Sequence, residues 1–273
     1  MNHFIYCMEQ YWASYKELML QQARERLELN HSYKVELAMG GEAAPVAPSS
    51  ESAARMAQDA IETAAGWLIQ ELLAHAVSVF SPNPVTPLDL DFQEVVDRLG
   101  YQVRSVSFQP ADLWRALEAK YGNGIGHSLA YQRRAESIGK YFSLSEGTEV
   151  PTKNGCMHLT RSIHYVEKSY SPPRLGHSES ETLSLQVLPA LASFATWAGM
   201  PGLAGDIAGL VPHFSHPTGV KSREAFNLGS VHEGRIKLVT YQTSFEWTFE
   251  PAVAEPLAIF LGEFYFAPLQ AAA

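Results

Sequence analysis

Apolar residues near the N-terminus recur at intervals of three and four positions. Ile5, Met8, Trp12, Tyr15 and Met19 have this spacing, with charged residues between and after them. The pattern predicts an amphipathic helix over about residues 3–30, with the apolar stripe in the core.

A second apolar pattern begins near Ser52 and continues to Ala76. It is wide and rich in alanine, and alanine lets a partner helix approach closely. The segment before it, GGEAAPVAPSS, has the Gly, Pro and Ser content of a flexible connection. We therefore expect the two helices to form an antiparallel hairpin.

The middle of the chain is predicted to be mostly helical. The segment SPNPVTP ends the second helix, because proline lacks an N–H donor and clashes with a continuing turn. A short helix over about residues 91–99 and a strand over 101–108 are expected next. Two further helices follow, from Pro110 to Gly122 and over about 128–142.

The rest of the chain alternates between extended and helical patterns. Residues 150–166 are extended around Asn154-Gly155, a favoured hairpin dipeptide. A helix over 181–197 contains Pro189, which is expected to kink or split it. A loop or a short helix is expected over about 203–211, a β-hairpin over 235–249, and a final amphipathic helix over about 253–264.

These elements predict an α+β fold. It has an N-terminal helical hairpin, a helical middle and a small, mostly antiparallel sheet capped by a C-terminal helix. We place the helical hairpin region in residues 1–100 and the α+β domain in 101–273.

Composition is ordinary for a folded protein, at 46% hydrophobic and 18% charged residues. No apolar run approaches the roughly 18 to 20 residues that span a bilayer, and the N-terminus has no pattern of a secretion signal. Cys7 and Cys156 are far apart, which excludes a disulfide framework and an all-cysteine zinc site. We expect a cytoplasmic protein without a membrane partner or a cofactor.

Charge is unevenly distributed along a chain of formal net charge −9. Residues 101–180 hold ten basic and seven acidic side chains, with tyrosines interleaved. Lys and Arg hold phosphates, and exposed tyrosines stack on unpaired bases, so this segment is a candidate nucleic-acid-binding face. Its basic members are Arg115, Lys120, Arg133, Arg134, Lys140, Arg161 and Lys168.

One resemblance concerns the last 160 or so residues. The run DLWRAL from Asp112, the strand pair LVTYQTSFEWTF and the segment PAVAEPLAIFLGEFY resemble an uncharacterised family carried on plasmids and integrated phage elements of proteobacteria. Members are sometimes described as methyltransferase-like, but no functional residue carries over. The resemblance implies only a role in the biology of a mobile genetic element. Together with the local charge reversal over residues 115–174, it leads us to expect a non-enzymatic accessory protein of such an element that binds nucleic acid or a nucleoprotein complex.

Two alternatives remain open. Residues 41–100 hold nine acidic and two basic side chains and could bind a basic protein partner. The chain would then be an inhibitor or adaptor of a host or CRISPR-type nucleoprotein machine.

The other alternative is a metal-dependent enzyme with an active site built from histidines. The candidate ligands are His158, His164, His213 and His216. Gly122-Asn123-Gly124-Ile125-Gly126 superficially matches a nucleotide-binding loop, but the residues before it have helical periodicity, which favours an inter-helix turn.

Overall fold

The computed structural model describes residues 2–40, 50–90, 108–147, 150–163, 165–167, 174–215, 223–241 and 243–267. The chain folds into two compact units. Unit 1 comprises Met1–Phe80 and Asp89–Asn123, and unit 2 comprises Ser81–Leu88 and Gly124–Ala273. The boundary predicted after residue 100 lies outside the described residues and stays a prediction.

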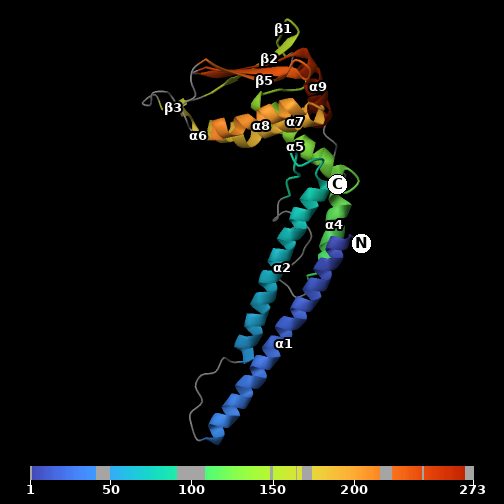
Figure 1. Ribbon diagram of the computed structural model, residues 1–273, viewed down its shortest axis with the longest axis vertical. Coiled ribbons are helices and arrows are strands. Elements are labelled where there is room, and N and C mark those ends of the chain that lie inside the picture. Colours follow the sequence, from blue (N-terminus) through green and yellow to red (C-terminus); the bar gives the residue numbers. More distant parts are fainter. Residues whose placement is uncertain are drawn as a thin grey trace. The chain divides into compact units, whose positions relative to one another are not determined.

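Unit 1 is built on two long helices, α1 (His3–Met39) and α2 (Ser50–Phe80), which run side by side (Figure 1). The Asn2 side chain caps α1 by accepting a hydrogen bond from the Phe4 N–H at 3.1 Å. The predicted helical hairpin is confirmed, although α1 extends nine residues beyond the predicted end at residue 30. No glycine or proline interrupts those nine residues.

A third helix, α4 (Pro110–Tyr121), packs against both α1 and α2. Pro110 occupies its first turn and Gly122 ends it, as predicted. The chain just before α4 is attached to α1, because the Trp12 indole donates a hydrogen bond to the Phe108 carbonyl at 2.7 Å and contacts the Phe108 ring edge-on. The predicted helix at 91–99, strand residues 101–107 and connection 41–49 lie outside the described residues.

Unit 2 contains a five-stranded antiparallel sheet in the order β1-β2-β7-β6-β5. Its strands are β1 (Thr152–Lys153), β2 (Cys156–Ser162), β5 (Glu224–Ser230), β6 (Gly234–Thr240) and β7 (Ser244–Phe249). The predicted hairpins are present, with Asn154 and Gly155 at positive φ between β1 and β2. A separate two-stranded pair joins β3 (Tyr165–Glu167) and β4 (Arg174–Leu175).

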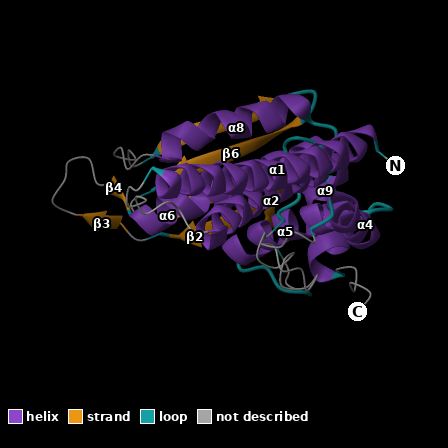
Figure 2. Cartoon of the chain, turned by 90° about the horizontal axis from the view of Figure 1, so that it is seen from below, coloured by secondary structure: helices purple, strands orange, loops and turns teal. Residues whose placement is uncertain are grey.

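Helices cover one side of this sheet (Figures 1 and 2). They are α5 (Ile125–Tyr141), α6 (His177–Glu181), the π-helix η1 (Thr182–Val187), α7 (Leu188–Trp197), α8 (Pro201–Ser215), α9 (Pro251–Leu261) and the π-helix η2 (Gly262–Phe266). The fold is therefore α+β, as predicted.

The core of unit 2 lies between the sheet and these helices. The inward residues of β7, namely Phe245, Trp247 and Phe249, are fully or almost fully buried, and α7 buries most of its length. Glu233 fixes the start of α8, because its carboxylate accepts hydrogen bonds from the N–H groups of Gly202 and Leu203.

Candidate functional site

The basic residues predicted to form one nucleic-acid-binding face belong to both units. In unit 1, α4 carries Arg115 and Lys120. Arg115 forms an ion pair with Asp112 one turn earlier, and the Lys120 ammonium lies 4.8 Å from the centroid of the Tyr121 ring. Both cations are thus engaged by their own helix.

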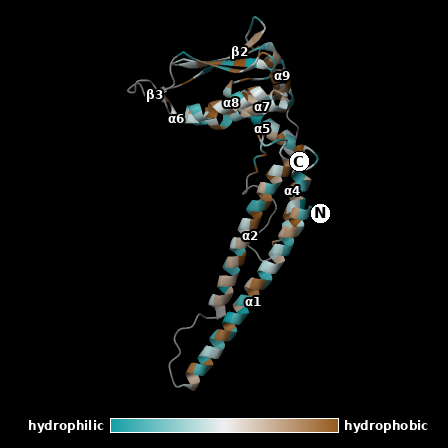
Figure 3. Ribbon diagram, in the orientation of Figure 1, coloured by the Kyte–Doolittle hydropathy of each residue, from teal (hydrophilic) through white to brown (hydrophobic). Residues whose placement is uncertain are grey.

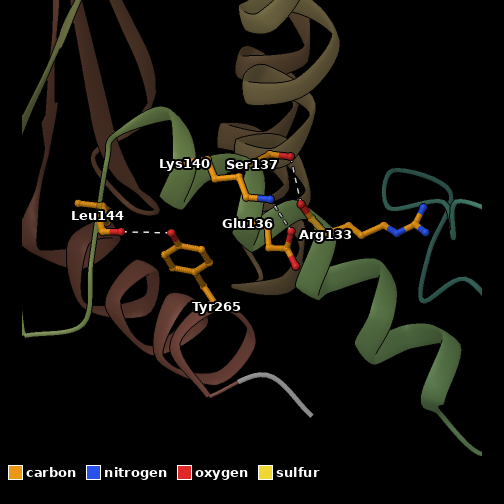
Figure 4. A network of polar contacts seen from close by, with 6 residues as sticks. All are labelled: Arg133, Glu136, Ser137, Lys140, Leu144 and Tyr265. Atoms are coloured by element: carbon orange, nitrogen blue, oxygen red, sulfur yellow. Dashed lines mark hydrogen bonds and ion pairs between the residues drawn. The ribbon is translucent and has the colours of Figure 1, made fainter. Parts of the chain in front are cut away.

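In unit 2, α5 carries Arg133, Arg134 and Lys140 (Figure 4). Arg133 and Lys140 are two turns apart and exposed on one face of the helix. Glu136 lies between them and forms an ion pair with Lys140 at 2.8 Å. That hydrogen bond raises the pKa of Lys140 above its ordinary value. An acidic side chain therefore divides the exposed cations of α5.

The remaining basic residues of the predicted nucleic-acid-binding face do not enlarge the basic surface of α5. Arg161 lies on β2, in the row of side chains that faces the core, and Lys168 lies outside the described residues. The interleaved tyrosines are not free to stack on bases where the structure describes them. Tyr131 packs against Phe260 and Phe264, and Tyr141 is buried.

Two of the four histidines proposed as metal ligands are described, and they lie on different elements, His158 on β2 and His213 on α8. The His158 Nδ1 is 3.2 Å from the Thr248 hydroxyl, on the neighbouring strand. His213 lies on α8 beside Glu224, 3.8 Å away. His164 and His216 are outside the described residues, and the part of the chain that is described contains no group of three His, Cys, Asp or Glu residues suited to a metal ion.

The glycine-rich segment joins two helices. Asn123 and Gly124 have φ values of 53° and 82°, the left-handed conformation that favours Gly and Asn in turns. Because α4 precedes the turn and α5 follows it, no strand leads into the loop, as a dinucleotide-binding site requires. The predicted inter-helix turn is confirmed.

The largest departure from the sequence prediction lies on α1. Only Ile5, Met8 and Trp12 are buried in this 37-residue helix, while Tyr15 and Met19 of the predicted core stripe are partly exposed. Hydrophobic residues are distributed around the rest of the helix instead of along one buried line (Figure 3). The exposed large ones are Tyr6, Tyr11, Leu18, Leu20, Leu29, Tyr33, Val35 and Met39.

Part of the exposed apolar surface lies where the two helices of the hairpin meet. The Tyr11 and Trp67 rings are in edge contact, with centroids 6.0 Å apart, and these residues are 48% and 51% exposed. Leu18 lies two turns beyond Tyr11 on α1, and the exposed Glu71 lies one turn beyond Trp67 on α2. We call Tyr11, Leu18, Trp67 and Glu71 the hairpin face.

Unit 1 also contains a cavity of about 490 Å³ where α1 begins and α2 ends. Its walls include Ile5, Phe80 and Trp114, with Arg115 and Glu118 also lining it. This volume is within the roughly 300–1,000 Å³ of pockets that hold small ligands or anchoring side chains. Four rings run in series past it, in the order Phe4, His75, Trp114 and Phe80.

Helices α1 and α2 of unit 1 carry an excess of acidic side chains. Helices α1 and α2 together hold nine acidic and five basic residues. The exposed apolar residues of α1 and α2 are interspersed with these charges along both helices.

In the described ranges, no helix combines the length and the apolarity that crossing a membrane requires.

Comparison with known proteins identifies no relative. No protein-family model, curated protein or solved structure matches the chain. The resemblance to a family borne by plasmids and phage elements therefore stays an expectation.

Proposed function

We propose that the protein is an adaptor that binds a basic protein partner through the hairpin face of unit 1. The single observation that carries the proposal is the exposure of α1. None of its residues from Ala13 to Met39 is buried, and six large hydrophobic side chains in that stretch are exposed.

Packing against the rest of unit 1 contributes little to the stability of this part of α1. Helices in proteins are stabilised mainly by packing of an apolar face, and isolated helices are marginal in water. Large exposed apolar patches on a folded protein are typical of interaction sites. A partner that covers α1 would remove this apolar surface from water, at about 25 cal/mol per Å².

The composition of the hairpin face indicates the chemistry of the partner. Trp and Tyr are enriched among residues that dominate binding energy at protein interfaces, and Tyr11 and Trp67 already contact each other. The Glu71 carboxylate beside the indole favours a Lys or Arg of the partner, which can pair with the carboxylate and lie over the ring. The excess of acidic residues in both helices adds long-range attraction.

Nucleic-acid binding is the competing proposal, and Arg133 and Lys140 are the observation in its favour. They are exposed on one face of α5, and the Lys140 side chain is 71% exposed. Because Glu136 lies between them, we expect weaker binding to phosphates, with a shallower salt dependence, than an unbroken basic face would give.

One capture experiment separates the two proposals. The tagged full chain is used to capture partners from a lysate of its host, with and without nuclease, as wild type, as Trp67→Ala with Glu71→Lys, and as Arg133→Glu with Lys140→Glu. The adaptor proposal predicts one stoichiometric protein of high isoelectric point that survives nuclease, is lost from the hairpin variant and is kept by the α5 variant.

The reverse pattern would contradict the adaptor proposal. Recovery of nucleic acid that depends on Arg133 and Lys140 would support the nucleic-acid reading. Self-association of the purified chain that Trp67→Ala abolishes would show that a second copy occupies the hairpin face. Since Trp67 and Glu71 are exposed, both hairpin variants should unfold at the wild-type midpoint.

A further inference from the structure

One arginine of unit 2 interrupts an apolar row. Alternate residues of a strand share a face, so Met157, Leu159, Arg161 and Ile163 point to the same side of the sheet. Met157, Leu159 and Ile163 are buried. The guanidinium of Arg161 therefore extends along the inner side of the sheet, among core residues.

Two further polar groups lie beside this guanidinium. Across the sheet, Arg161 pairs with Phe245, and Trp247 is its diagonal neighbour opposite Leu159. Tyr141, the last residue of α5, contributes a ring whose centroid is 5.5 Å from the Arg161 guanidinium carbon. The Tyr141 and Trp247 residues are only 4% and 0% exposed, whereas Arg161 is partly exposed and marks the side nearest solvent.

The electrostatics of Tyr141 confirm that these groups lie close together. Burial raises the pKa of Tyr141 well above its ordinary value. The Trp247 indole N–H opposes this increase because it approaches the Tyr141 hydroxyl as a hydrogen-bond donor; the Glu179 carboxylate adds to the increase and the Arg161 charge opposes it.

The donors of these three side chains lack good acceptors. The Tyr141 hydroxyl, the Arg161 Nε–H and the Trp247 Nε1–H are buried, and none makes a hydrogen bond of normal geometry in the part of the chain that the structure describes; the Trp247 N–H lies only close enough to the Tyr141 hydroxyl oxygen to lower the pKa of Tyr141. Buried donors without partners are rare, because each loses its hydrogen bonds to water without replacement. Three such donors in one place indicate that a ligand supplies the missing acceptor.

We propose that Tyr141, Arg161 and Trp247 bind the carboxylate of a ligand with an apolar body. Three donors match an anion, and the planar guanidinium suits the two oxygens of a carboxylate. Aromatic residues surround the site, with Phe142 near Trp247 and Phe249 beside it. Such walls suit an apolar body, and nearby Glu179 disfavours ligands of higher negative charge, such as phosphate.

A purely structural reading explains only part of this arrangement. On its outer side β2 pairs with β1 at Cys156 and Met157, and the His158 N–H donates to the Pro151 carbonyl. Among the described strands, the part of β2 beyond His158 has no neighbour on that side, and inward charges on edge strands discourage aggregation. That role accounts for an arginine at 161. It does not account for two buried aromatic donors next to it without acceptors.

The donors themselves report on binding in ¹H–¹⁵N NMR spectra. The full chain is titrated with benzoate, and with benzamide and inorganic phosphate as matched controls. We expect benzoate to shift the Trp247 indole resonance, assigned with Trp247→Phe, and both controls to leave it in place. The Trp12 indole, which already donates to the Phe108 carbonyl, is the internal reference.

Two variants complete the test. Arg161→Gln should weaken benzoate binding by roughly thirty-fold or more, the effect of losing one partner of a buried charged pair. Tyr141→Phe should weaken binding several-fold with little change in the unfolding midpoint, because its hydroxyl makes no hydrogen bond of normal geometry in the described residues.

Three results would overturn the proposal. They are a stationary Trp247 resonance in benzoate, an equal response to benzamide or phosphate, and unchanged binding in both variants. The site lies wholly in unit 2, so its failure would leave the adaptor proposal for the hairpin face untouched, and the converse also holds.

Discussion

At Gly139, α5 leaves no room for a side chain. A Cβ added there would lie 2.4 Å from the Tyr265 ring, whose hydroxyl is fixed by a hydrogen bond to the Leu144 carbonyl (Figure 4). This contact packs η2 against α5, although the two elements are far apart in the sequence. A single missing methyl group therefore allows the C-terminal segment to close the core.

Gly139→Ala should lower the free energy of unfolding of unit 2 by about 1–3 kcal/mol, the usual cost of overpacking. The matched control is Gly209→Ala on α8, where no heavy atom would lie within 4 Å of the new Cβ. Because alanine is the better helix former, the control should be neutral or more stable, by up to about 1 kcal/mol. Urea denaturation measures both, and a Gly139→Ala protein as stable as wild type would contradict the packing described.

The protonation state of His75 follows from its neighbours. The Asn2 carboxamide oxygen accepts from the Phe4 N–H, so its nitrogen faces His75 Nε2 at 3.0 Å and donates to it. Burial also lowers the pKa of His75 below its ordinary 6.5. His75 is therefore a neutral acceptor in the folded protein, and protonation would remove that hydrogen bond.

This arrangement makes part of the stability of unit 1 depend on pH. The unfolded chain binds the proton first, so the free energy of unfolding should fall as the pH drops through about 6.5 toward the folded pKa. Replacing His75 with Gln removes this component. Urea midpoints at about pH 7.5 and about pH 5.5 should differ more for wild type than for His75→Gln; equal differences would show that His75 contributes nothing.

At the scale of elements, local signals predicted most of the fold. Proline and glycine marked the ends of α2 and α4, the Asn-Gly pair marked the β1–β2 turn, and alternation marked β6 and β7. Each of these signals is read from a few neighbouring residues. Such elements can be predicted because their cause is local.

Elements that depend on tertiary contacts were either not predicted or predicted with the wrong length. A loop or a short helix was predicted over about residues 203–211, and the structure has the longer, fifteen-residue α8 there. Its N-terminus is capped by Glu233 from a distant hairpin, which no local pattern reveals. Strand β5 was not predicted at all, and its Gly229 N–H is held by Asp206 of α8.

Pro189 was predicted to kink or split its helix, and a π-helix before it accommodates the proline instead. The helix neither breaks nor separates there, because it widens into the π-helix η1 directly before α7 begins. A wider turn moves the preceding carbonyls away from the proline ring, and Pro189 then occupies the first turn of α7, where its missing N–H costs little.

The candidate sites were less predictable than the fold. Tyr141, Arg161 and Trp247 come from three elements, and only the β2–β7 register brings the last two together. The signal present in the sequence was an arginine in phase with apolar residues on β2. It was interpreted as part of a surface because the face of a strand cannot be assigned before its pairing is known.

The part of α1 beyond Trp12 should also open more easily than α7. Residues beyond Trp12 have no buried side chain, whereas α7 is almost entirely buried. Local opening is easiest where few apolar contacts must break. Amide hydrogen exchange should therefore be much faster over residues 20–39 than over 188–197, and similar protection in both would contradict the marginal packing inferred for α1.

At the scale of the whole molecule, the two units carry different chemistry. Unit 1 exposes apolar side chains on long, acidic helices, and unit 2 encloses a compact core with buried donors. Our two proposals divide the functions accordingly, with a protein partner proposed for the hairpin and a small carboxylate proposed for unit 2.

Site-specific photocrosslinking tests the central claim most directly. A photoreactive amino acid is placed in the full chain at position 67 on the hairpin face, or at position 185, where Leu185 of unit 2 is 66% exposed. After irradiation in a nuclease-treated host lysate, we expect position 67 alone to form a covalent adduct with one basic protein, and Glu71→Lys to suppress it. Equal crosslinking at both positions, or adducts at position 185 alone, would contradict a partner bound to the hairpin face.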